Sequence, residues 1–550
     1  MSTNHAFDAI IAGGGHNGLA AAAYLAKAGR KVLLLERLDQ PGGAAVSAQA
    51  FDGVGARLSR YSYLVSLLPQ QIIDDLGLRI TLARRRYSSY TPDPANPGRA
   101  LLIDNEDAES TAASFGAIGA SDDEFRAFNE FYASCGKLTR ALWPTMTAPL
   151  PTRSAAKSLA RLAGAAEAWE AMVEQPVGHA IAEALRHDLV RGVVLTDALI
   201  GTFARADDAD LQQNICFLYH LIGGGTGDWD VPVGGMGAVS GELERAARDA
   251  GATILTSAEV TSVRPGGVVS YRHDGAHHTV SAPWVLSNVA PVVLDRLRNA
   301  ASGGPIAAAQ GGTAPAKHAT QNPNHLREGA QVKVNLLLKR LPRLLDDAVS
   351  PEAAFGGTFH INETWSQLDA AYVSAAGGAV PDPLPCEIYC HSLTDPSILS
   401  AELQAAGAHT LTVFGLHVPD RLVTAQNNDA RRAELQAAVL RSLNSVLAEP
   451  VEELLLTGPD GRPCIETKTT LDIERAVGMP RGNIFHGGLD WPFVDDDAPL
   501  DTPAQRWGVA TDDPQLLLCG SGARRGGAVS AIGGHNAAMA VLESGRPRSS

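Results

Sequence analysis

Residues 7–36 of this 550-residue chain read FDAIIAGGGHNGLAAAAYLAKAGRKVLLLE, and this stretch decides the fold. The apolar, partly β-branched run at 7–12 predicts a buried strand that ends in a glycine-rich turn. Strong helix formers follow as far as Gly29, where a glycine ends the helix. The run at 31–35 predicts a second strand, closed by Glu36. This order of elements predicts a dinucleotide-binding unit: a strand, a glycine turn, a helix, a second strand and an acidic residue.

The glycines of this turn match the G-x-G-x-x-G pattern at Gly13, Gly15 and Gly18. In this pattern the first glycine permits the tight turn, the second lets the backbone approach a pyrophosphate, and the third lets the helix pack close to the strand. The helix N-terminus offers unpaired N–H groups and a positive dipole end to the anion. Glu36 can accept hydrogen bonds from both ribose hydroxyls, and its charge repels a 2′-phosphate. We therefore expect an unphosphorylated adenosine.

Two later glycine-rich loops favour FAD as the dinucleotide. The pair Gly42-Gly43 soon after the acid is a second point of close backbone approach, suited to a longer cofactor. Near the other end of the chain, an apolar strand at 515–520 leads into a glycine-rich loop at 521–529. A helix from about Ala531 to Glu543 follows. In a flavoprotein this second helix N-terminus would face the end of the ring where negative charge gathers on reduction.

Three motifs resemble those of the phytoene desaturase-related FAD oxidoreductases. They are Gly15-His16-Asn17-Gly18-Leu19, Gly43-Ala44-Ala45, and the stretch from Cys519-Gly520-Ser521-Gly522 to Asn536-Ala537-Ala538. Within these oxidoreductases the chain is most similar to the subgroup of pyridine nucleotide-disulfide oxidoreductase domain-containing protein 2, and next to the CrtO-type carotenoid ketolases. The segment 228–237 also resembles the Pro-x-Gly-Gly-Met turn of these enzymes, and Glu259-Val260 matches the segment whose valine backbone meets the adenine.

The resemblance implies an α/β fold in which a Rossmann-type FAD-binding domain, of the amine oxidase and phytoene desaturase kind, is interleaved with an α+β substrate domain. The FAD-binding domain would be discontinuous and comprise residues 1–75, 230–295 and 480–550. Residues 76–229 and 296–479 would form the substrate-binding domain.

The motifs and the resemblance together give a set of expected cofactor-binding residues. These are Gly13, Gly15, His16, Asn17, Gly18, Glu36, Arg37, Gly42, Gly43, Ala44, Val260, Gly520, Gly527 and Val529. Two positions depart from the pattern: Ala44 stands where the wider amine-oxidase superfamily often has an arginine that contacts the pyrophosphate, and Arg525 stands where relatives commonly have proline. No cysteine pair follows Gly43, so no disulfide relay is expected.

Composition excludes several other classes of protein. The net charge of −15 and an aromatic content of 5% argue against nucleic acid as a partner. No apolar run is long enough to span a membrane, and the N-terminus does not have the pattern of a secretory signal. The six cysteines are scattered, which predicts free buried thiols and a cytoplasmic protein. A lipophilic substrate would favour peripheral membrane contact, although the sequence shows no basic amphipathic helix. No spacing of ligand residues indicates a metal centre.

The middle of the chain predicts the walls of a substrate pocket. A helical pattern covers 122–220 and is clearest at 125–138 and 166–195. A loop without periodicity lies at 303–324. Alternating stretches predict strands of a second sheet near 331–338, 387–391 and 410–418.

The sequence singles out no catalytic side chain. His220, His391 and His486 are candidates for the flavin-facing cavity, the alternative being hydrogen-bonded core histidines. His16 and Asn17 are interpreted as structural residues beside the cofactor. Tyr61, Tyr63 and Trp229 could line the pocket or serve only in packing.

We therefore expect an FAD-dependent oxidoreductase that transfers hydride from a C–H bond of an apolar substrate to flavin N5, with oxygen or a quinone reoxidising the flavin. The resemblance alone suggests a polyene or isoprenoid substrate. One alternative is a flavin amine oxidase, which a pocket walled by two aromatic rings beside the flavin would favour. Another is a flavin-bound regulatory protein with little turnover. The sequence does not indicate an oligomeric state.

Overall fold

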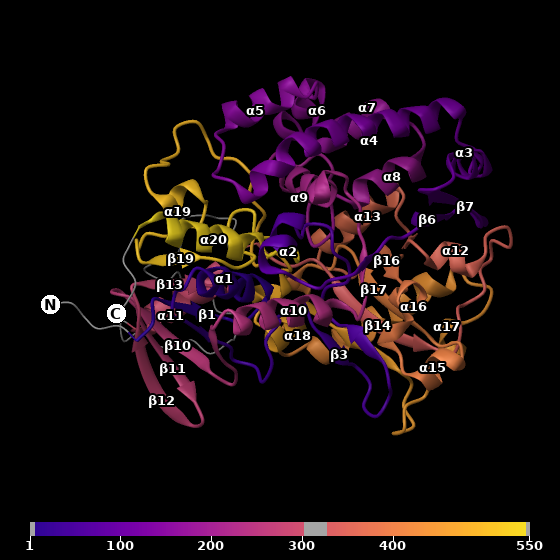
Figure 1. Ribbon diagram of the computed structural model, residues 1–550. Helices are drawn as coiled ribbons and strands as arrows, with labels where there is room; N and C mark the ends of the chain where they lie inside the picture. Colours follow the sequence, from indigo (N-terminus) through magenta and orange to yellow (C-terminus); the bar gives the residue numbers. More distant parts are fainter. Residues whose placement is uncertain (1–5, 302–326, 546–550) are drawn as a thin grey trace.

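A parallel five-stranded sheet forms the centre of the part of the molecule that contains the expected dinucleotide-binding turn (Figure 1). The structure is a computed structural model that describes residues 6–301 and 327–545, so the loop expected at 303–324 lies outside the described residues. The strand order is β19-β13-β1-β2-β9. The strands are β1 (Ala9–Ala12), β2 (Val32–Leu35), β9 (Thr253–Leu255), β13 (Trp284–Ser287) and β19 (Leu516–Leu518).

Every residue of β1, β2 and β13 is buried, which explains their uninterrupted apolar sequences. Because neighbouring strands of this sheet all pair in parallel, their carboxyl ends meet at one edge. In folds of this kind that edge is where ligands bind.

The two ends of the chain meet on one face of this sheet. Helix α1 (His16–Lys27) packs against α10 (Met236–Asp249) and α20 (Ile532–Glu543). A side chain at Gly534 could not fit, because a Cβ atom there would lie 1.9 Å from the carbonyl oxygen of Asn17. Figure 1 accordingly shows the indigo α1 and the yellow α20 side by side.

A small antiparallel sheet adjoins the adenine end of the expected cofactor site. It consists of β10 (Glu259–Arg264), β11 (Val268–His273) and β12 (Ala276–Ser281), and α11 (Pro291–Ala301) packs against β10.

A seven-stranded mixed sheet forms the floor of the second part of the molecule. Its order is β18-β14-β17-β16-β15-β6-β7. The strands are β6 (Tyr87–Asp93), β7 (Asn96–Asp104), β14 (Val332–Leu338), β15 (Thr358–Ile361), β16 (Cys386–Tyr389), β17 (His409–Gly415) and β18 (Ile465–Lys468). The second sheet expected from the alternating stretches is thus present. The strand expected to reach His391 ends at Tyr389, because a short helix, α14 (His391–Thr394), begins there.

A helical layer covers the other side of this region, at the top of Figure 1. It contains α3 (Ala108–Ala117), α4 (Asp122–Leu142), η1 (Trp143–Thr147), α5 (Arg153–Leu162), α6 (Ala166–Trp169), the π-helix η2 (Glu170–Glu174), α7 (Val177–Ala184), α8 (Asp188–Thr196) and α9 (Gln212–Ile222). The stretch at 166–195 is helical, but the prediction that it is one continuous pattern was wrong, because it is divided into α6, η2, α7 and α8. Pro176 interrupts it, because proline lacks an N–H and disfavours helix in the preceding residue.

Helix α5 corrects a second expectation, that no basic amphipathic helix exists. Ala156 and Ala160 form the buried side of this helix. The basic residues Lys157 and Arg161 lie outside that side, as does Leu162, which is 86% exposed. The sequence signal is weak because the buried side of the helix consists of alanine.

The remaining elements connect these layers. They are β3 (Ser47–Gln49), β4 (Arg57–Ser59), α2 (Gln70–Leu76), β5 (Leu82–Ala83), η3 (Gly223–Gly225), β8 (Val231–Pro232), α12 (Pro351–Phe355), α13 (Trp365–Ala376), η5 (Pro396–Ile398), α15 (Ala401–Ala405), η6 (Asp420–Leu422), α16 (Asn428–Asn444), α17 (Val451–Leu454), α18 (Thr470–Val477), η7 (Pro480–Gly482) and α19 (Pro503–Arg506). In the described part of the chain, every helix is too short or too polar to cross a bilayer. All six cysteines are free and buried, as expected.

Candidate active site

The glycine turn between β1 and α1 lies at the edge where the parallel strands end. Asn288, directly after β13, donates its side-chain N–H to the carbonyl oxygen of Gly13 at 3.1 Å. A Cβ atom on Gly18 would lie 2.3 Å from that same oxygen, and one on Gly15 would lie 2.9 Å from Nδ2 of Asn288. Side chains at these positions would displace the turn. Bare backbone at Gly13 and Gly15 instead lines a cavity, as the pattern predicts for a pyrophosphate site.

Glu36 closes β2 and lines the same cavity. Its Oε2 accepts the N–H of Gly14 and its Oε1 accepts the N–H of Leu38, both at 2.7 Å. Each oxygen keeps a second lone pair for a ribose hydroxyl. The carboxylate is therefore fixed by the backbone, and its ribose role stays a prediction.

The Gly42-Gly43 loop rests directly against the first turn. Gly42 donates its N–H to Gly14 at 2.8 Å, and a Cβ atom on Gly43 would come within 3.1 Å of the Cα of Gly15. Both residues have positive φ angles, of 123° and 59°. Only glycine adopts this geometry without strain, so the pair permits the close approach that its sequence indicated.

The C-terminal loop is bonded to the start of α1. Nε2 of His16 lies 3.0 Å from the carbonyl oxygen of Ala528, and Asn17 donates its amide to Gly526 at 3.2 Å. Burial lowers the pKa of His16 to about 4, so the imidazole is neutral. These contacts agree with the interpretation of His16 and Asn17 as structural residues.

Arg525 points away from the cavity. It is 1% exposed, and its guanidinium donates to the carbonyl oxygens of Thr145, Ala148 and Trp507 at 2.5–2.9 Å. Burial lowers its pKa to about 9. Its neighbour Arg524 donates to the carbonyl oxygens of residues 491 and 493. This arginine pair therefore anchors the backbone around the C-terminal loop.

One cavity of about 1740 Å³ contains most of the expected cofactor residues. Nine of them line it: Gly13, Gly15, His16, Glu36, Arg37, Gly43, Ala44, Val260 and Val529. The other five, Asn17, Gly18, Gly42, Gly520 and Gly527, are not among its lining residues. A Cβ on Gly520 would lie 2.6 Å from the backbone oxygen of Asn288, so this glycine serves packing behind the wall. Asn288 itself lines the cavity and was not among the expected contacts.

Beyond the dinucleotide turns the cavity wall becomes aromatic. Tyr61, Tyr63 and Trp229 line it, as one reading of the sequence proposed, and Tyr389 joins them. The rings of Tyr63 and Tyr389 lie 5.2 Å apart between centroids, at 38°. At this separation the two rings pack on each other, so they do not form two facing walls with a substrate between them.

Lys333 is the one buried lysine in this wall, among the described residues, and sequence reasoning missed it. It is 2% exposed, and its Nζ donates to the carbonyl oxygen of Tyr61 and lies 4.1 Å from the ring centroid of Tyr63. Burial moves the pKa of Lys333 well below its ordinary value. A lysine in the apolar alternation of β14 was the signal that could have revealed it, since lysine is rarely buried.

The three candidate histidines separate in the structure. His220 and His486 line the cavity, whereas His391 does not and stacks on the ring of Tyr389. Nε2 of His220 lies 3.2 Å from a carboxylate oxygen of Asp197. Burial lowers the pKa of His220 and His391 to about 3 and that of His486 to about 4, so all three rings are neutral.

Comparison with known proteins gives this geometry a context. Residues 11–70 match the family model of the NAD(P)-binding Rossmann-like domain, which agrees with the dinucleotide turn. An uncharacterized protein of Mycobacterium tuberculosis is 59% identical over 542 residues, covering 98% of this chain and 97% of the relative. The chain belongs to the family of this mycobacterial protein. Pyridine nucleotide-disulfide oxidoreductase domain-containing protein 2 of Rattus norvegicus is 28% identical, covering 98% of this chain and 93% of that protein.

A solved structure extends the comparison to the fold. Cyclohexylamine oxidase of Brevibacterium oxydans matches with a TM-score of 0.53 and 15% identity, covering 98% of each chain. The chain therefore combines a Rossmann-type domain and mixed sheets in the arrangement of the flavin amine oxidase fold, as the sequence predicted. At 15% identity, the similarity to this oxidase is evidence of a shared fold alone.

Proposed function

We propose that this protein is an FAD-dependent oxidoreductase that removes hydride from a C–H bond of an apolar substrate. The observation that carries the proposal is the cavity of about 1740 Å³, which runs from the dinucleotide turns to an inner aromatic wall. A cofactor and a lipophilic molecule could therefore meet inside one cavity. The resemblance to phytoene desaturase-related enzymes supports a polyene or isoprenoid as the substrate.

The residues of the cavity fit FAD. The bare backbone at Gly15 and Gly43 leaves room for a pyrophosphate at the start of α1. Glu36 would hold the ribose, and the backbone at Val260 would meet the adenine. Ala528 and Val529, shortly before α20, line the cavity where the ring would lie.

FAD, when bound, supplies a ring that accepts hydride at N5. The chain holds the substrate C–H bond in place and keeps water away, which is the work of the aromatic wall. Removal of hydride leaves the substrate one proton in excess. We assign that proton to Nζ of Lys333, because burial favours its neutral amine, which can accept a proton. Oxygen or a quinone would serve as the final acceptor.

The absorption spectrum of the purified protein tests the cofactor. We expect bound flavin, and a colourless protein that cannot be reconstituted with FAD would contradict the proposal. Anaerobic bleaching across polyenes, amines and hydroxy compounds then tests the substrate class. Bleaching by polyenes supports the proposal, bleaching by amines alone identifies an amine oxidase, and a flavin that no substrate class reduces indicates a regulatory protein.

A further inference from the structure

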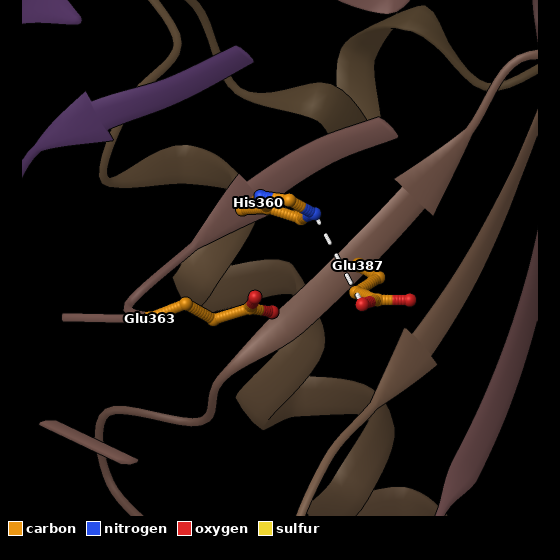
Figure 2. A group of neighbouring side chains, drawn as sticks. All are labelled: His360, Glu363 and Glu387. Atoms are coloured by element: carbon orange, nitrogen blue, oxygen red, sulfur yellow. Dashed lines mark ion pairs between the residues drawn. The ribbon is translucent and has the colours of Figure 1, made fainter. Parts of the chain in front are cut away.

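Three side chains converge on one another in the seven-stranded sheet (Figure 2). His360 lies on β15, Glu363 follows that strand, and Glu387 lies on β16. Their ligand atoms all lie within 4.8 Å of one another, and Nε2 of His360 is 4.0 Å from Oε1 of Glu387. The motif His360-x-x-Glu363 is visible in the sequence, but only the pairing of β15 with β16 adds the third residue.

All three side chains are buried, with 1–4% of their surface exposed. Neither carboxylate oxygen of Glu363 has a hydrogen-bond partner. The nearby Thr196 hydroxyl donates to Oε1 of Glu387 at 3.4 Å, and it lowers the pKa of both glutamates only as a minor influence beside burial. The half-buried Arg85 is the cation that acts on Glu387, but its guanidinium donates to the carbonyl oxygen of Trp229 and to the hydroxyl of Thr358 rather than to the carboxylates. A buried carboxylate without a partner is costly, so Glu363 requires either a proton or a cation.

The surrounding contacts leave the inner atoms of the group available. Nδ1 of His360 lies 3.1 Å from the Thr91 hydroxyl, which leaves Nε2 facing the carboxylates. Tyr389 donates to Oε2 of Glu387 at 2.5 Å, which leaves Oε1 on the inner side. Outer contacts of this kind orient metal ligands in proteins. Burial lowers the pKa of His360 to about 3, so its ring is neutral, as ligation requires.

We propose that His360, Glu363 and Glu387 form a binding site for one divalent metal ion of the Zn²⁺ or Mn²⁺ type. Two carboxylates and a neutral imidazole carry a charge of −2, which a divalent ion neutralises. The mixed nitrogen and oxygen donors suit both ions. Tetrahedral ligation at roughly 2.0–2.1 Å places ligand atoms about 3.3 Å apart, so the observed separations must contract, which side-chain rotation allows.

The bound ion has a structural position. It would join β15 to β16 next to Thr358 and Tyr389, which lie two residues from His360 and Glu387 on the same face of the sheet and line the cavity. It would therefore hold the inner wall in place, whatever the cofactor or substrate. The competing explanation is a cluster that holds protons in place of a metal. Burial raises the pKa of both glutamates, and so do neighbouring carboxylates: Glu387 and Asp197 act on Glu363, and Asp197 acts on Glu387.

Metal binding to the whole protein separates these explanations. The protein is stripped with a chelator, supplied with Zn²⁺ or Mn²⁺, and passed through gel filtration before its metal content is measured. We expect about one retained ion per chain, a rise in Tm of a few degrees, and an anomalous diffraction peak among the three residues.

Three variants supply the matched comparison. Glu363→Gln and His360→Gln should weaken binding at least about tenfold and abolish the rise in Tm. Glu124→Gln changes another buried carboxylate, whose oxygens accept the N–H groups of Arg186 and His187, and should bind like wild type.

Two results would overturn the proposal. One is wild-type protein that retains neither ion, and this result favours the protonated cluster. The other is equal retention by Glu363→Gln, which means that the ion binds elsewhere. If His360→Gln does not fold, Glu363→Gln still decides, because its amide has the shape of a protonated carboxyl group. The anomalous peak needs no variant, and none of these readouts depends on flavin or on activity.

Discussion

Glu36 has a role in the free protein as well as the predicted role toward ribose. Its two oxygens connect the N–H of Gly14 in the turn to the N–H of Leu38 after β2. The carboxylate thus fixes the turn before any dinucleotide binds. The sequence predicted the ligand contact from position alone, whereas the bracing of the turn needed the coordinates.

Glu36→Ala should weaken FAD binding about tenfold to a hundredfold, because hydrogen bonds to a charged group contribute roughly 1.5–3 kcal/mol each. Titration of the apoprotein with FAD measures this loss. Glu36→Gln, which keeps one acceptor, should bind with intermediate affinity. Unchanged affinity in the alanine variant would show that the ribose assignment is wrong.

Lys333→Met should slow anaerobic flavin reduction by about 10²- to 10⁴-fold without loss of bound flavin. In the wild type the rate should rise with pH through the lowered pKa of Lys333, since only the neutral amine accepts a proton. The methionine variant should lose this rise. Stopped-flow reduction across pH checks both expectations.

The control for this experiment is Lys468→Met. Lys468 lies directly opposite Lys333 in the β14–β18 pair, but it is not among the lining residues of the cavity. Its removal should leave the rate of reduction close to that of the wild type. If both variants reduce at the wild-type rate, Lys333 is not the proton acceptor.

At the scale of elements, the start of α1 depends on the absence of side chains. Gly18 meets the carbonyl oxygen of Gly13 and the amide of Asn288, and both leave too little room for a methyl group. The start of α1, the end of β1 and the end of β13 therefore pack closely together at Gly18.

Gly18→Ala should destabilise the protein by about 1–3 kcal/mol and reduce its FAD content, because backbone must move to admit the methyl group. Gly241→Ala is the matched control within α10, where a Cβ atom meets nothing within 4 Å. It should leave stability unchanged or raise it by about 0.5–1 kcal/mol. Urea unfolding measures both, and equal effects would refute the packing argument.

At the scale of the whole molecule, Arg525 connects distant parts of the chain. It joins the C-terminal loop to η1 and to Trp507 through three carbonyl oxygens. η1 belongs to the helical layer, whereas β19 and α20 belong to the nucleotide-binding part. The interleaved domains are therefore held together by buried charge-to-backbone contacts as well as by apolar packing.

Arg525→Met should lower the free energy of unfolding by about 2–5 kcal/mol, because it leaves buried carbonyl oxygens without donors. Arg462→Met, at a side chain that is 85% exposed, should change it by less than about 0.5 kcal/mol. Thermal unfolding compares the two variants. A stable Arg525→Met protein would mean that these contacts do not hold the domains together.

Local order along the chain determined the fold class. Turns and helix starts depend on local backbone freedom, so a few neighbouring residues are enough to predict them. This holds for the run from 7 to 36, the Gly42-Gly43 pair and the final glycine loop. Nine of the fourteen expected cofactor residues line the cavity for the same reason. The domain boundaries and the cofactor contacts themselves stay predictions.

Tertiary structure alone decided which distant side chains meet. Lys333 on β14 meets Tyr63, which lies in a loop far earlier in the chain, and Glu387 approaches His360 because β16 pairs with β15. No spacing in the sequence encodes that pairing, since register depends on packing across the whole sheet. The inner wall and the group of His360, Glu363 and Glu387 therefore come from tertiary structure, whereas the dinucleotide turn was already determined by the sequence.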